Sequence, residues 1–148
     1  MEGYYLTCED CGFTEHFTTG PGYFYPSVCV KTLEEIRAGK KFPSLKKAAD
    51  KYPNAHASVD TVLYVCPKCR TAEPCDQVMI WIPVDETGAW MSDLKRELPH
   101  TKYRLASFLV HRCPHCGTRM KIWKSGEIRC PKCGGKFSEL QGDGCIWD

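Results

Sequence analysis

Long apolar runs are missing from this 148-residue sequence: the longest, Val78 to Val84, has seven residues. A membrane-spanning helix needs about 20 apolar residues, so none is expected. The N-terminal residues also lack a basic region followed by an apolar stretch, so we expect no secretory signal peptide. Both absences favour a cytoplasmic protein that has no membrane partner.

Signatures of common enzyme classes are missing as well. The sequence contains no phosphate-binding glycine loop, no nucleophile elbow and no His-Glu-x-x-His motif. Acidic residues are nearly absent from 101–136, where Glu127 is the only one. The missing motifs indicate that the protein is not an enzyme, and the missing acidic residues make this segment strongly basic.

Cysteine, in contrast, is abundant, with 11 residues. The odd count and the lack of an export signal argue against a disulfide framework. Eight cysteines form four Cys-x-x-Cys pairs, and this spacing lets one tight turn direct both thiolates at one metal ion. The pairs are Cys8/Cys11, Cys66/Cys69, Cys113/Cys116 and Cys130/Cys133.

The residues within and after the pairs favour such turns, which we call knuckles 1 to 4 in chain order. Glycine, which accepts a positive φ, follows the second cysteine in three knuckles, at Gly12, Gly117 and Gly134. Arg70 takes this place in knuckle 2, so that knuckle is expected to be strained or to adopt a different turn. Proline follows the first cysteine in three knuckles and fixes φ where the turn begins.

Two knuckles complete one tetrahedral site of four cysteines, so the four knuckles predict two structural Zn²⁺ ions. The 13 residues between Cys116 and Cys130 suit a short hairpin, which favours one site built from knuckles 3 and 4. Knuckles 1 and 2 then form the other site across a 54-residue insertion. Loop-closure entropy grows only logarithmically with length, so it permits this pairing without excluding the others. Four cysteine ligands leave no open coordination position, which again argues against an enzyme.

The order strand, knuckle, hairpin, knuckle occurs twice along the chain. It predicts an α+β protein made of two linked zinc ribbons with rubredoxin-like knuckles. The first ribbon is expected over 1–90 with a two-helix insertion at about 20–58, then a linker over 91–100 and a basic second ribbon over 101–148. Strands are expected at 4–7, 13–18, 59–65, 78–82 and 103–110, with a hairpin joining 119–123 to 127–129.

Inside the insertion, two amphipathic patterns predict short helices. The first helix ends at Gly39, and a candidate capping box from Thr32 to Glu35 leaves open a start as late as Leu33. The second has Ser44 as a candidate N-cap and ends at Pro53. The buried face of the first helix is expected to contain Cys29, Leu33 and Ile36.

Residues 101–136 carry nine Lys or Arg and one Glu, a net charge of +8, whereas 1–100 carry −3. Cations interleaved with aromatic side chains suit single-stranded nucleic acid, whose binding combines phosphate neutralisation with base stacking. Alternatively, the cations offset the thiolates and the aromatic residues form a minimal core, or the surface binds a protein. The candidate nucleic-acid-binding residues are Arg119, Lys121, Trp123, Lys124, Arg129 and Lys132.

Three cysteines and two histidines stand outside this scheme. Cys29 fits the apolar face of a helix, and Cys75, close to knuckle 2, is an alternative ligand. Cys145 is expected to pack back onto the ribbon. His111 and His115 flank the first cysteine of knuckle 3, and either can replace a thiolate in a site of three cysteines and one histidine.

The four knuckles together with the last two residues resemble a group of small, largely uncharacterised bacterial proteins with two zinc ribbons. The resemblance implies a bacterial, cytoplasmic protein with structural zinc, and the group brings no established activity. The motifs that carry it are Cys8-x-x-Cys11-Gly12, Cys66-Pro67-x-Cys69, Cys113-Pro114-x-Cys116-Gly117, Cys130-Pro131-x-Cys133-Gly134 and Trp147-Asp148.

These observations predict a non-catalytic zinc-binding adaptor whose basic second ribbon contacts nucleic acid or a nucleoprotein. A rubredoxin-like electron carrier is one alternative, because a site of four thiolates accepts iron as well as zinc. A protein-binding module is the other, and it would use the aromatic segment 23–25 together with the two helices.

Overall fold

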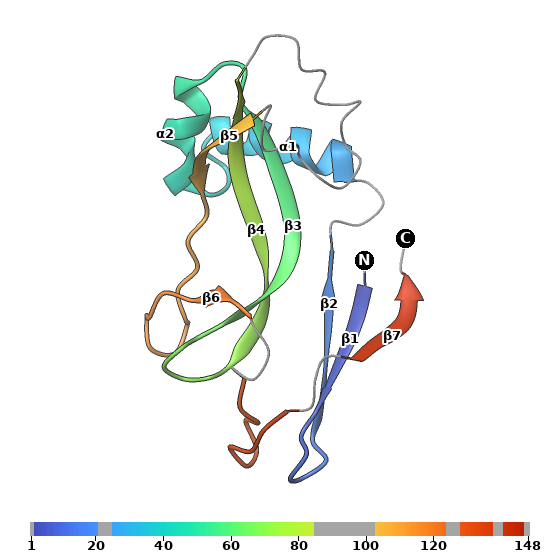
Figure 1. Cartoon of the computed structure of the whole chain (residues 1–148). Helices are drawn as coiled ribbons and strands as arrows, with labels where there is room; N and C mark the ends of the chain where they lie inside the picture. Colours follow the sequence, from blue (N-terminus) through green and yellow to red (C-terminus); the bar gives the residue numbers. More distant parts are fainter. Residues whose placement is uncertain (1, 21–24, 85–102, 124–127, 138–140, 147–148) are drawn as a thin grey trace. The chain divides into compact units, whose positions relative to one another are not determined.

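The computed structural model describes residues 2–20, 25–84, 103–123, 128–137 and 141–146, which form two helices and seven strands (Figure 1). The protein is therefore mixed α+β, as expected. The expected linker 91–100 lies outside the described residues. No helix in the described ranges is both long enough and apolar enough to cross a membrane.

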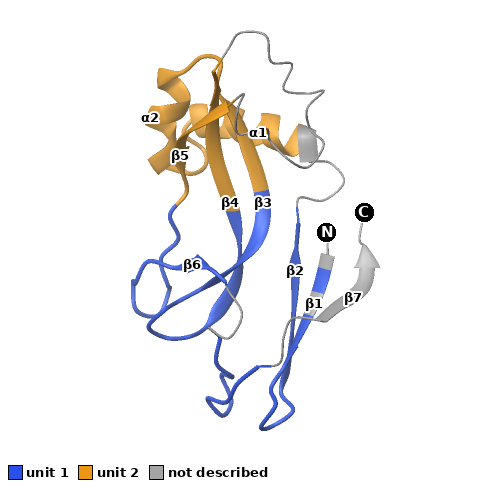
Figure 2. Cartoon of the chain, viewed as in Figure 1, with its two compact units in different colours: residues 1–23, 60–76, 110–148 blue, residues 24–59, 77–109 orange. Residues whose placement is uncertain are grey.

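The chain divides into two compact units that alternate along the sequence (Figure 2). Unit 1 contains 1–23, 60–76 and 110–148, and unit 2 contains 24–59 and 77–109. We expected two consecutive units, 1–90 and 101–148. The arrangement differs because strands β3 (His56–Val65) and β4 (Ala72–Pro83) each contribute residues to both units.

Unit 1 begins with the expected hairpin. Strands β1 (Glu2–Thr7) and β2 (Thr14–Thr19) pair antiparallel from Glu2↔Thr19 to Thr7↔Thr14, with knuckle 1 at the tip. Strand β7 (Gln141–Ile146) pairs with the other edge of β1, which gives the strand order β2-β1-β7. The C-terminal segment that contains Cys145 thus pairs with the N-terminal strand.

The segment after knuckle 3 pairs differently from expectation. Strand β6 (Lys121–Ile122) pairs with the end of β3 in the register Val65↔Lys121, and the backbone N–H of Trp123 donates to the Leu63 carbonyl at 2.8 Å. The prediction that 119–123 pairs with 127–129 is therefore wrong for the residues that the structure describes. The β-branched end of β3 offers a regular strand edge, on which two residue pairs and the hydrogen bond of Trp123 form.

The apolar core of unit 1 is small. Trp123 and Phe137 are partly buried and pack against one group of buried apolar side chains. A second apolar group includes the buried cysteines of knuckles 2 and 3. The first apolar group consists of Leu6, Phe17, Leu63, Val65 and Ile128, and the second apolar group also includes Tyr64 and Met120.

Unit 2 contains the two expected helices, α1 (Tyr25–Arg37) and α2 (Pro43–Lys51). Helix α1 begins seven residues before Thr32, which is buried within the helix, so the capping-box prediction is wrong. The N-cap of α2 is Phe42, with φ of 44° and no side-chain hydrogen bond, so Ser44 is not the cap. Pro43 replaces a side-chain cap as the start signal, because its fixed φ suits the first helical position.

The ends of both helices follow the predicted signals. At the end of α1, the N–H of Gly39 donates to the Ile36 carbonyl at 3.0 Å, and glycine accepts the φ of 72° found there. Helix α2 stops before Tyr52, which is extended as expected for a residue that precedes proline. The Arg37 guanidinium donates to the carbonyls of Ala49, Tyr52 and Pro53 at 3.0–3.3 Å and so satisfies the C-terminal end of α2.

Strand β5 (Tyr103–Phe108) pairs antiparallel with the part of β4 in unit 2, so it does not belong to a C-terminal ribbon. Strand β4 is apolar on both faces and buried from Ile80 to Ile82, as predicted. The Trp81 indole N–H donates to the Ser58 hydroxyl at 2.9 Å. The core between the helices and these strands consists of Ile36, Leu45, Ala49, Ala55, Ala57, Val78 and Ile80.

Candidate metal centres

The four knuckles share one backbone hydrogen-bond pattern. In each, the N–H of the first cysteine donates to the carbonyl five residues later at 2.7–2.9 Å. The N–H of the residue after the second cysteine donates back to the carbonyl of the first at 2.8–3.0 Å. That residue has a positive φ in every knuckle: Gly12 69°, Arg70 61°, Gly117 69° and Gly134 74°.

Arg70 therefore adopts the same left-handed conformation as the three glycines. A residue with a Cβ pays about 1–2 kcal/mol for this conformation, so knuckle 2 carries backbone strain that the others avoid. Of the two outcomes predicted for Arg70, strain rather than a different turn is the correct one. The hydrogen bonds of the turn therefore outweigh the preference of arginine for a negative φ.

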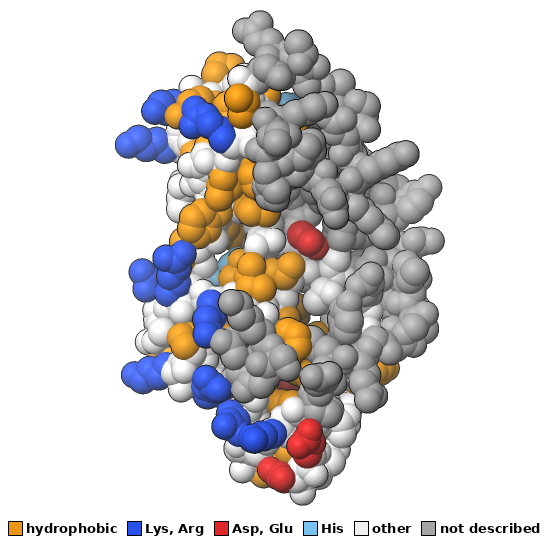
Figure 3. Space-filling model, viewed as in Figure 1, with side chains coloured by type: hydrophobic (Ala, Val, Ile, Leu, Met, Phe, Trp, Pro, Cys, Tyr) orange, Lys and Arg blue, Asp and Glu red, His pale blue; other side chains and the backbone are white. Residues whose placement is uncertain are grey.

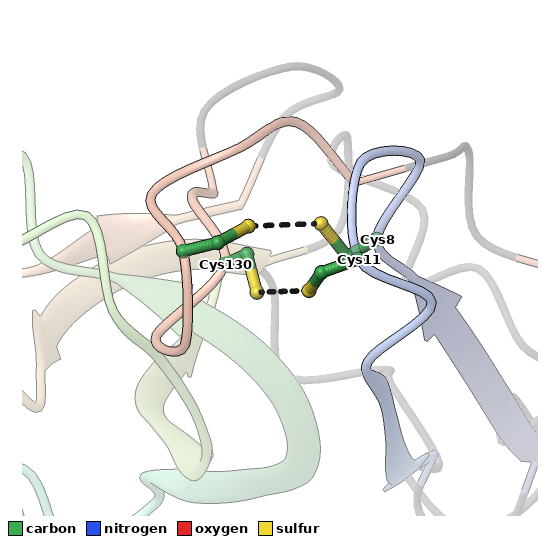
Figure 4. Close-up of side chains that lie close together, drawn as sticks. Cys8, Cys11 and Cys130 are labelled. Carbon is green, nitrogen blue, oxygen red and sulfur yellow. Dashed lines mark hydrogen bonds between the residues drawn. The ribbon is translucent and has the colours of Figure 1, made fainter.

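The eight cysteine sulfurs lie in two groups of four, and within each group all sulfurs lie within 4.8 Å of one another. Figure 4 shows the first group, in which the side chains of two knuckles point toward each other. Each group can hold one metal ion. We call Cys8, Cys11, Cys130 and Cys133 cluster 1, and Cys66, Cys69, Cys113 and Cys116 cluster 2.

The sulfur separations fit tetrahedral coordination. A Zn–S bond of about 2.3 Å places two sulfurs of a tetrahedron about 3.8 Å apart. In cluster 1, the sulfurs of Cys8 and Cys133 lie 3.5 Å apart, and those of Cys11 and Cys130 lie 3.7 Å apart. In cluster 2, the corresponding separations are 3.5 Å from Cys66 to Cys116 and 3.9 Å from Cys69 to Cys113.

The pairing of the knuckles is the main correction to the sequence analysis. We expected knuckle 3 to share an ion with knuckle 4, and knuckle 1 with knuckle 2. Instead, knuckle 3 faces knuckle 2 and knuckle 4 faces knuckle 1. Backbone pairing explains both contacts: β6 joins β3, which leads into knuckle 2, and the N–H of Glu9 donates to the Lys136 carbonyl at 3.0 Å.

The two clusters differ in exposure. The first cysteine of each knuckle is buried, with 0–3% of its surface exposed. The second cysteines differ, because Cys11 and Cys133 in cluster 1 are exposed whereas Cys69 and Cys116 in cluster 2 are half-buried. Cluster 1 is therefore the more accessible of the two.

Hydrogen bonds divide the thiols of cluster 2 into a strong and a weak acid. The side chain and backbone of Thr118 hydrogen-bond to Cys116 and lower its pKa to about 6. Cys69 is the weak acid: the hydrogen bond between Cys69 and Cys116, followed by burial, raises the pKa of Cys69 to about 12. Once Cys116 is a thiolate, its negative charge therefore keeps the Cys69 thiol protonated until a metal cation binds and balances the charge.

Cluster 1 shows the same division. Burial opposes ionisation of Cys130, but the backbone N–H groups of Cys133 and Lys132 outweigh it and lower its pKa to about 7. At Cys133 the N–H of Gly135 favours the thiolate, yet the neighbouring sulfurs and burial together raise its pKa to about 12. Metal binding must therefore displace protons from both clusters.

Of the remaining cysteines, Cys29 and Cys75 are not part of either group. Cys29 lies buried on α1, which confirms its expected place in a core. Cys75 packs, partly buried, against the apolar side of cluster 2, and burial raises the pKa of its thiol. It belongs to neither group of four, so its prediction as an alternative ligand is not supported. The side chain of Cys145 lies outside the described residues.

Among the described residues, no histidine belongs to either group. The Nε2 atom of His111 lies 2.9 Å from the Asp76 carbonyl oxygen, and its ring packs edge-on against Tyr64 at 4.7 Å. His115 is exposed within knuckle 3. A site of three cysteines and one histidine is therefore not what the structure forms.

The candidate nucleic-acid residues divide between the two clusters. Arg119 and Lys121 are exposed beside cluster 2, whereas Lys132 is exposed and Arg129 half-buried beside cluster 1. Trp123 packs, partly buried, against the core of unit 1, which matches the alternative interpretation of this residue. Lys124 lies outside the described residues, as do Tyr23 and Phe24 of the aromatic segment.

Comparisons with protein-family models, with curated proteins and with solved structures found no match to this chain.

Proposed function

We propose that each cluster binds a structural Zn²⁺ ion, and that the protein is a non-catalytic module that contacts nucleic acid or a nucleoprotein. The contact surface is the basic face of unit 1 around cluster 2. Zinc suits the ligand set because it prefers four thiolates in tetrahedral geometry, and four protein ligands leave no position for a substrate. Backbone N–H groups support the sulfurs, with Cys69 N–H 3.3 Å from Cys66 Sγ and Gly135 N–H 3.4 Å from Cys133 Sγ.

One observation carries the nucleic-acid part of the proposal: the cations of knuckles 2 and 3, far apart in sequence, meet around cluster 2. Knuckle 3 and its flanks, residues 110–123, contain no acidic residue, and the acidic residues that follow knuckle 2 are Glu73 and Asp76. Four thiolates and one Zn²⁺ carry a net charge of −2, so five cations still leave a net charge of +1 when Glu73 and Asp76 are included. The cations are Lys68, Arg112, Arg119 and Lys121, which are exposed, and Arg70, which is half-buried.

Cluster 1 provides a natural comparison. Its knuckles bring Glu9 and Asp10 together with Lys132 and Lys136, so acidic and basic side chains oppose one another there. Phosphate attraction is therefore expected at cluster 2 rather than at cluster 1. This differs from the sequence-based expectation, in which one continuous basic ribbon carried the interface.

The test is fluorescence anisotropy of labelled single-stranded and hairpin RNA and DNA at about 50 and 200 mM salt. We expect micromolar or tighter binding that weakens steeply with salt. The variant Arg112→Gln/Lys121→Gln should weaken it at least tenfold, and Lys132→Gln/Lys136→Gln, at cluster 1, is the charge-matched control. Equal effects of the two variants, or no binding at 50 mM salt, would reject the cluster 2 interface.

The bound metal separates this function from the electron-carrier alternative. Elemental analysis of the purified protein should give two zinc ions per chain and a colourless solution. A red protein that contains iron would instead favour a rubredoxin-like carrier, since tetrahedral thiolate sites accept both metals.

A further inference from the structure

Unit 2 carries an excess of positive charge that the metal clusters do not explain. Its described residues include eight Lys or Arg and three Asp or Glu. Two of the acidic residues are engaged, because Glu35 pairs with Lys41 and Asp50 pairs with Lys46, both at 2.8 Å. In the space-filling view, Lys and Arg side chains gather at the α2 end of unit 2 (Figure 3).

Part of this charge lines a groove in unit 2 where α2 meets β5. The groove has a volume of about 260 Å³ and is open to solvent. No acidic side chain lines it, and its apolar walls are alanines. Its polar groups are the two ammonium groups of Lys47 and Lys51 and the three hydroxyls of Ser44, Tyr52 and Ser107.

Tyr52 concentrates positive charge at one side of the groove. The Lys51 ammonium lies 5.1 Å from the centre of the Tyr52 ring, and the Arg104 guanidinium lies 5.5 Å from it. Hydrogen bonds from Lys51 and Arg104 also lower the pKa of the Tyr52 hydroxyl. An anion that enters the groove would therefore meet the Tyr52 hydroxyl close to two cations.

We propose that this groove binds the phosphate backbone of a single-stranded nucleic acid. Lysine, arginine, serine and tyrosine side chains are the usual partners of phosphate oxygens in nucleic-acid complexes. Lys47 and Lys51 lie one helical turn apart, about 6 Å, so each can meet a different phosphate. A groove that tracks the backbone with cations is how proteins hold single strands without reading their sequence.

The shape of the groove argues against an acidic peptide as the occupant. Peptides and proteins bind mainly through large anchor side chains that fill apolar pockets. This groove offers only the methyl groups of Ala48 and Ala106 and has no such pocket. The proposal goes beyond the function proposed for unit 1, because it assigns phosphate binding to different residues in a different unit.

The test uses the full-length, zinc-loaded protein and a labelled oligo(dT) strand of about 20 nucleotides, with anisotropy measured at about 50 and 200 mM salt. We expect the groove variant Lys47→Gln/Lys51→Gln to weaken binding at least tenfold at low salt. The slope of log K against log salt should fall by about 1.4, since each phosphate contact on a single strand contributes about 0.7. The variant Lys31→Gln/Lys40→Gln removes the same charge from exposed positions of unit 2 outside the groove and should change affinity less than twofold.

The outcomes separate this inference from the function proposed for unit 1. If the groove variant weakens binding and Arg112→Gln/Lys121→Gln does not, the result supports phosphate binding in the groove and rejects the cluster 2 interface. The reverse result rejects phosphate binding in the groove. Equal effects of the groove and control variants also overturn it, because they indicate general charge attraction. A poly-glutamate peptide that displaces oligo(dT) at equal charge concentration would identify an acidic peptide as the occupant and overturn the assignment to nucleic acid.

Discussion

Unit 1 and unit 2 achieve order by different means. Unit 2 packs two helices on parts of three strands, β3, β4 and β5, and Ile36, Leu45, Ala49, Val78 and Ile80 at its centre are completely buried. Unit 1 has strands and knuckles but no helix among its described residues. Its buried apolar side chains form two small groups near the eight cysteines. The difference shows that one short chain can combine a conventional apolar core with a part that has few buried apolar side chains and two groups of cysteines that can hold metal.

The energetic reason lies in size. A small apolar core offsets little of the conformational entropy that folding removes, so small units need additional cross-links. In unit 1, the two groups of four cysteines bring together segments separated by more than 40 residues in cluster 2 and more than 110 in cluster 1, so a metal ion bound by each would connect them. Unit 2 needs no such connection, and the four predictions below test this contrast, beginning with the largest expected effect.

Loss of a cluster 2 ligand in Cys113→Ser should disorder unit 1 around knuckles 2 and 3 while α1 and α2 stay folded. A structural Zn²⁺ contributes on the order of 10–16 kcal/mol of apparent binding free energy. That is comparable with the whole net stability of a typical domain, about 5–15 kcal/mol. Amide hydrogen exchange with mass spectrometry should show lost protection in 64–72 and 112–120 and unchanged protection in both helices.

The matched variant Cys130→Ser removes a cluster 1 ligand and should expose knuckles 1 and 4 instead. Exposure of knuckle 4 rather than knuckle 2 in Cys113→Ser would contradict the pairing of the knuckles. Equal loss of protection in α1 and α2 would contradict the separate stabilisation of the two units.

Leu45→Ala should affect the other unit: it should destabilise unit 2 without releasing metal from unit 1. Leu45 is fully buried in the core of unit 2, and such truncations cost about 2–5 kcal/mol. Amide exchange should accelerate in α1 and α2 while elemental analysis still finds both metal ions. Val30→Ala, at a position 47% exposed on the same unit, is the control and should have little effect. Release of metal from the Leu45 variant would show that unit 2 supports the clusters.

A smaller effect is expected from the backbone of the knuckles. Arg70→Gly should relieve the left-handed strain at φ of 61°, whereas Gly117→Ala should introduce it at φ of 69°, where a Cβ would meet no atom within 4 Å. Each change is worth about 1 kcal/mol, or roughly fivefold in the metal affinity of cluster 2, with opposite signs. Competition with a zinc chelator measures both. The same sign for both variants would show that side-chain charge, not backbone strain, dominates at this position.

The smallest effect concerns the pH dependence of unit 2. Burial, followed by the charge of Arg37, lowers the pKa of His56 below its usual value of 6.5. The unfolded chain therefore binds a proton more readily than the folded chain does, so stability falls as the pH drops through about 6.5. His56→Gln should reduce this loss between pH 7.5 and 6, measured by urea unfolding of the zinc-loaded protein. An unchanged pH dependence would show that other groups determine it.

The sequence was sufficient for the local features, and particular residues show why. The knuckle turns follow from cysteine spacing and from Gly12, Gly117 and Gly134, since positive φ is a property of the residue itself. The hairpin of β1 and β2, the two helices and the burial of β4 also agree with their local patterns. Helix α1 includes Cys29 as its apolar face indicated, but the capping box was wrong because Thr32 and Glu35 have the spacing of a helix start inside a longer helix.

The clearest failure was the pairing of the knuckles. Chain separation favoured knuckles 3 and 4, which are 13 residues apart, yet loop-closure entropy differs by only a few kcal/mol at most among the possible pairings. Strand pairing decides between them, because β6 joins β3 and so brings knuckle 3 to knuckle 2. The division into two consecutive ribbons, 1–90 and 101–148, likewise overlooked that β3 and β4 contribute to both units.

The sequence by itself determined that eight cysteines form four metal-binding turns, because each turn depends on residues within six positions of one another. Only the tertiary structure decided which turns share an ion, which cations gather around cluster 2, and which lysines line the groove of unit 2. The physical reason is range: turn geometry is fixed by neighbouring residues, whereas the partners of a strand or a thiolate depend on hydrogen bonds and packing between segments distant in the chain.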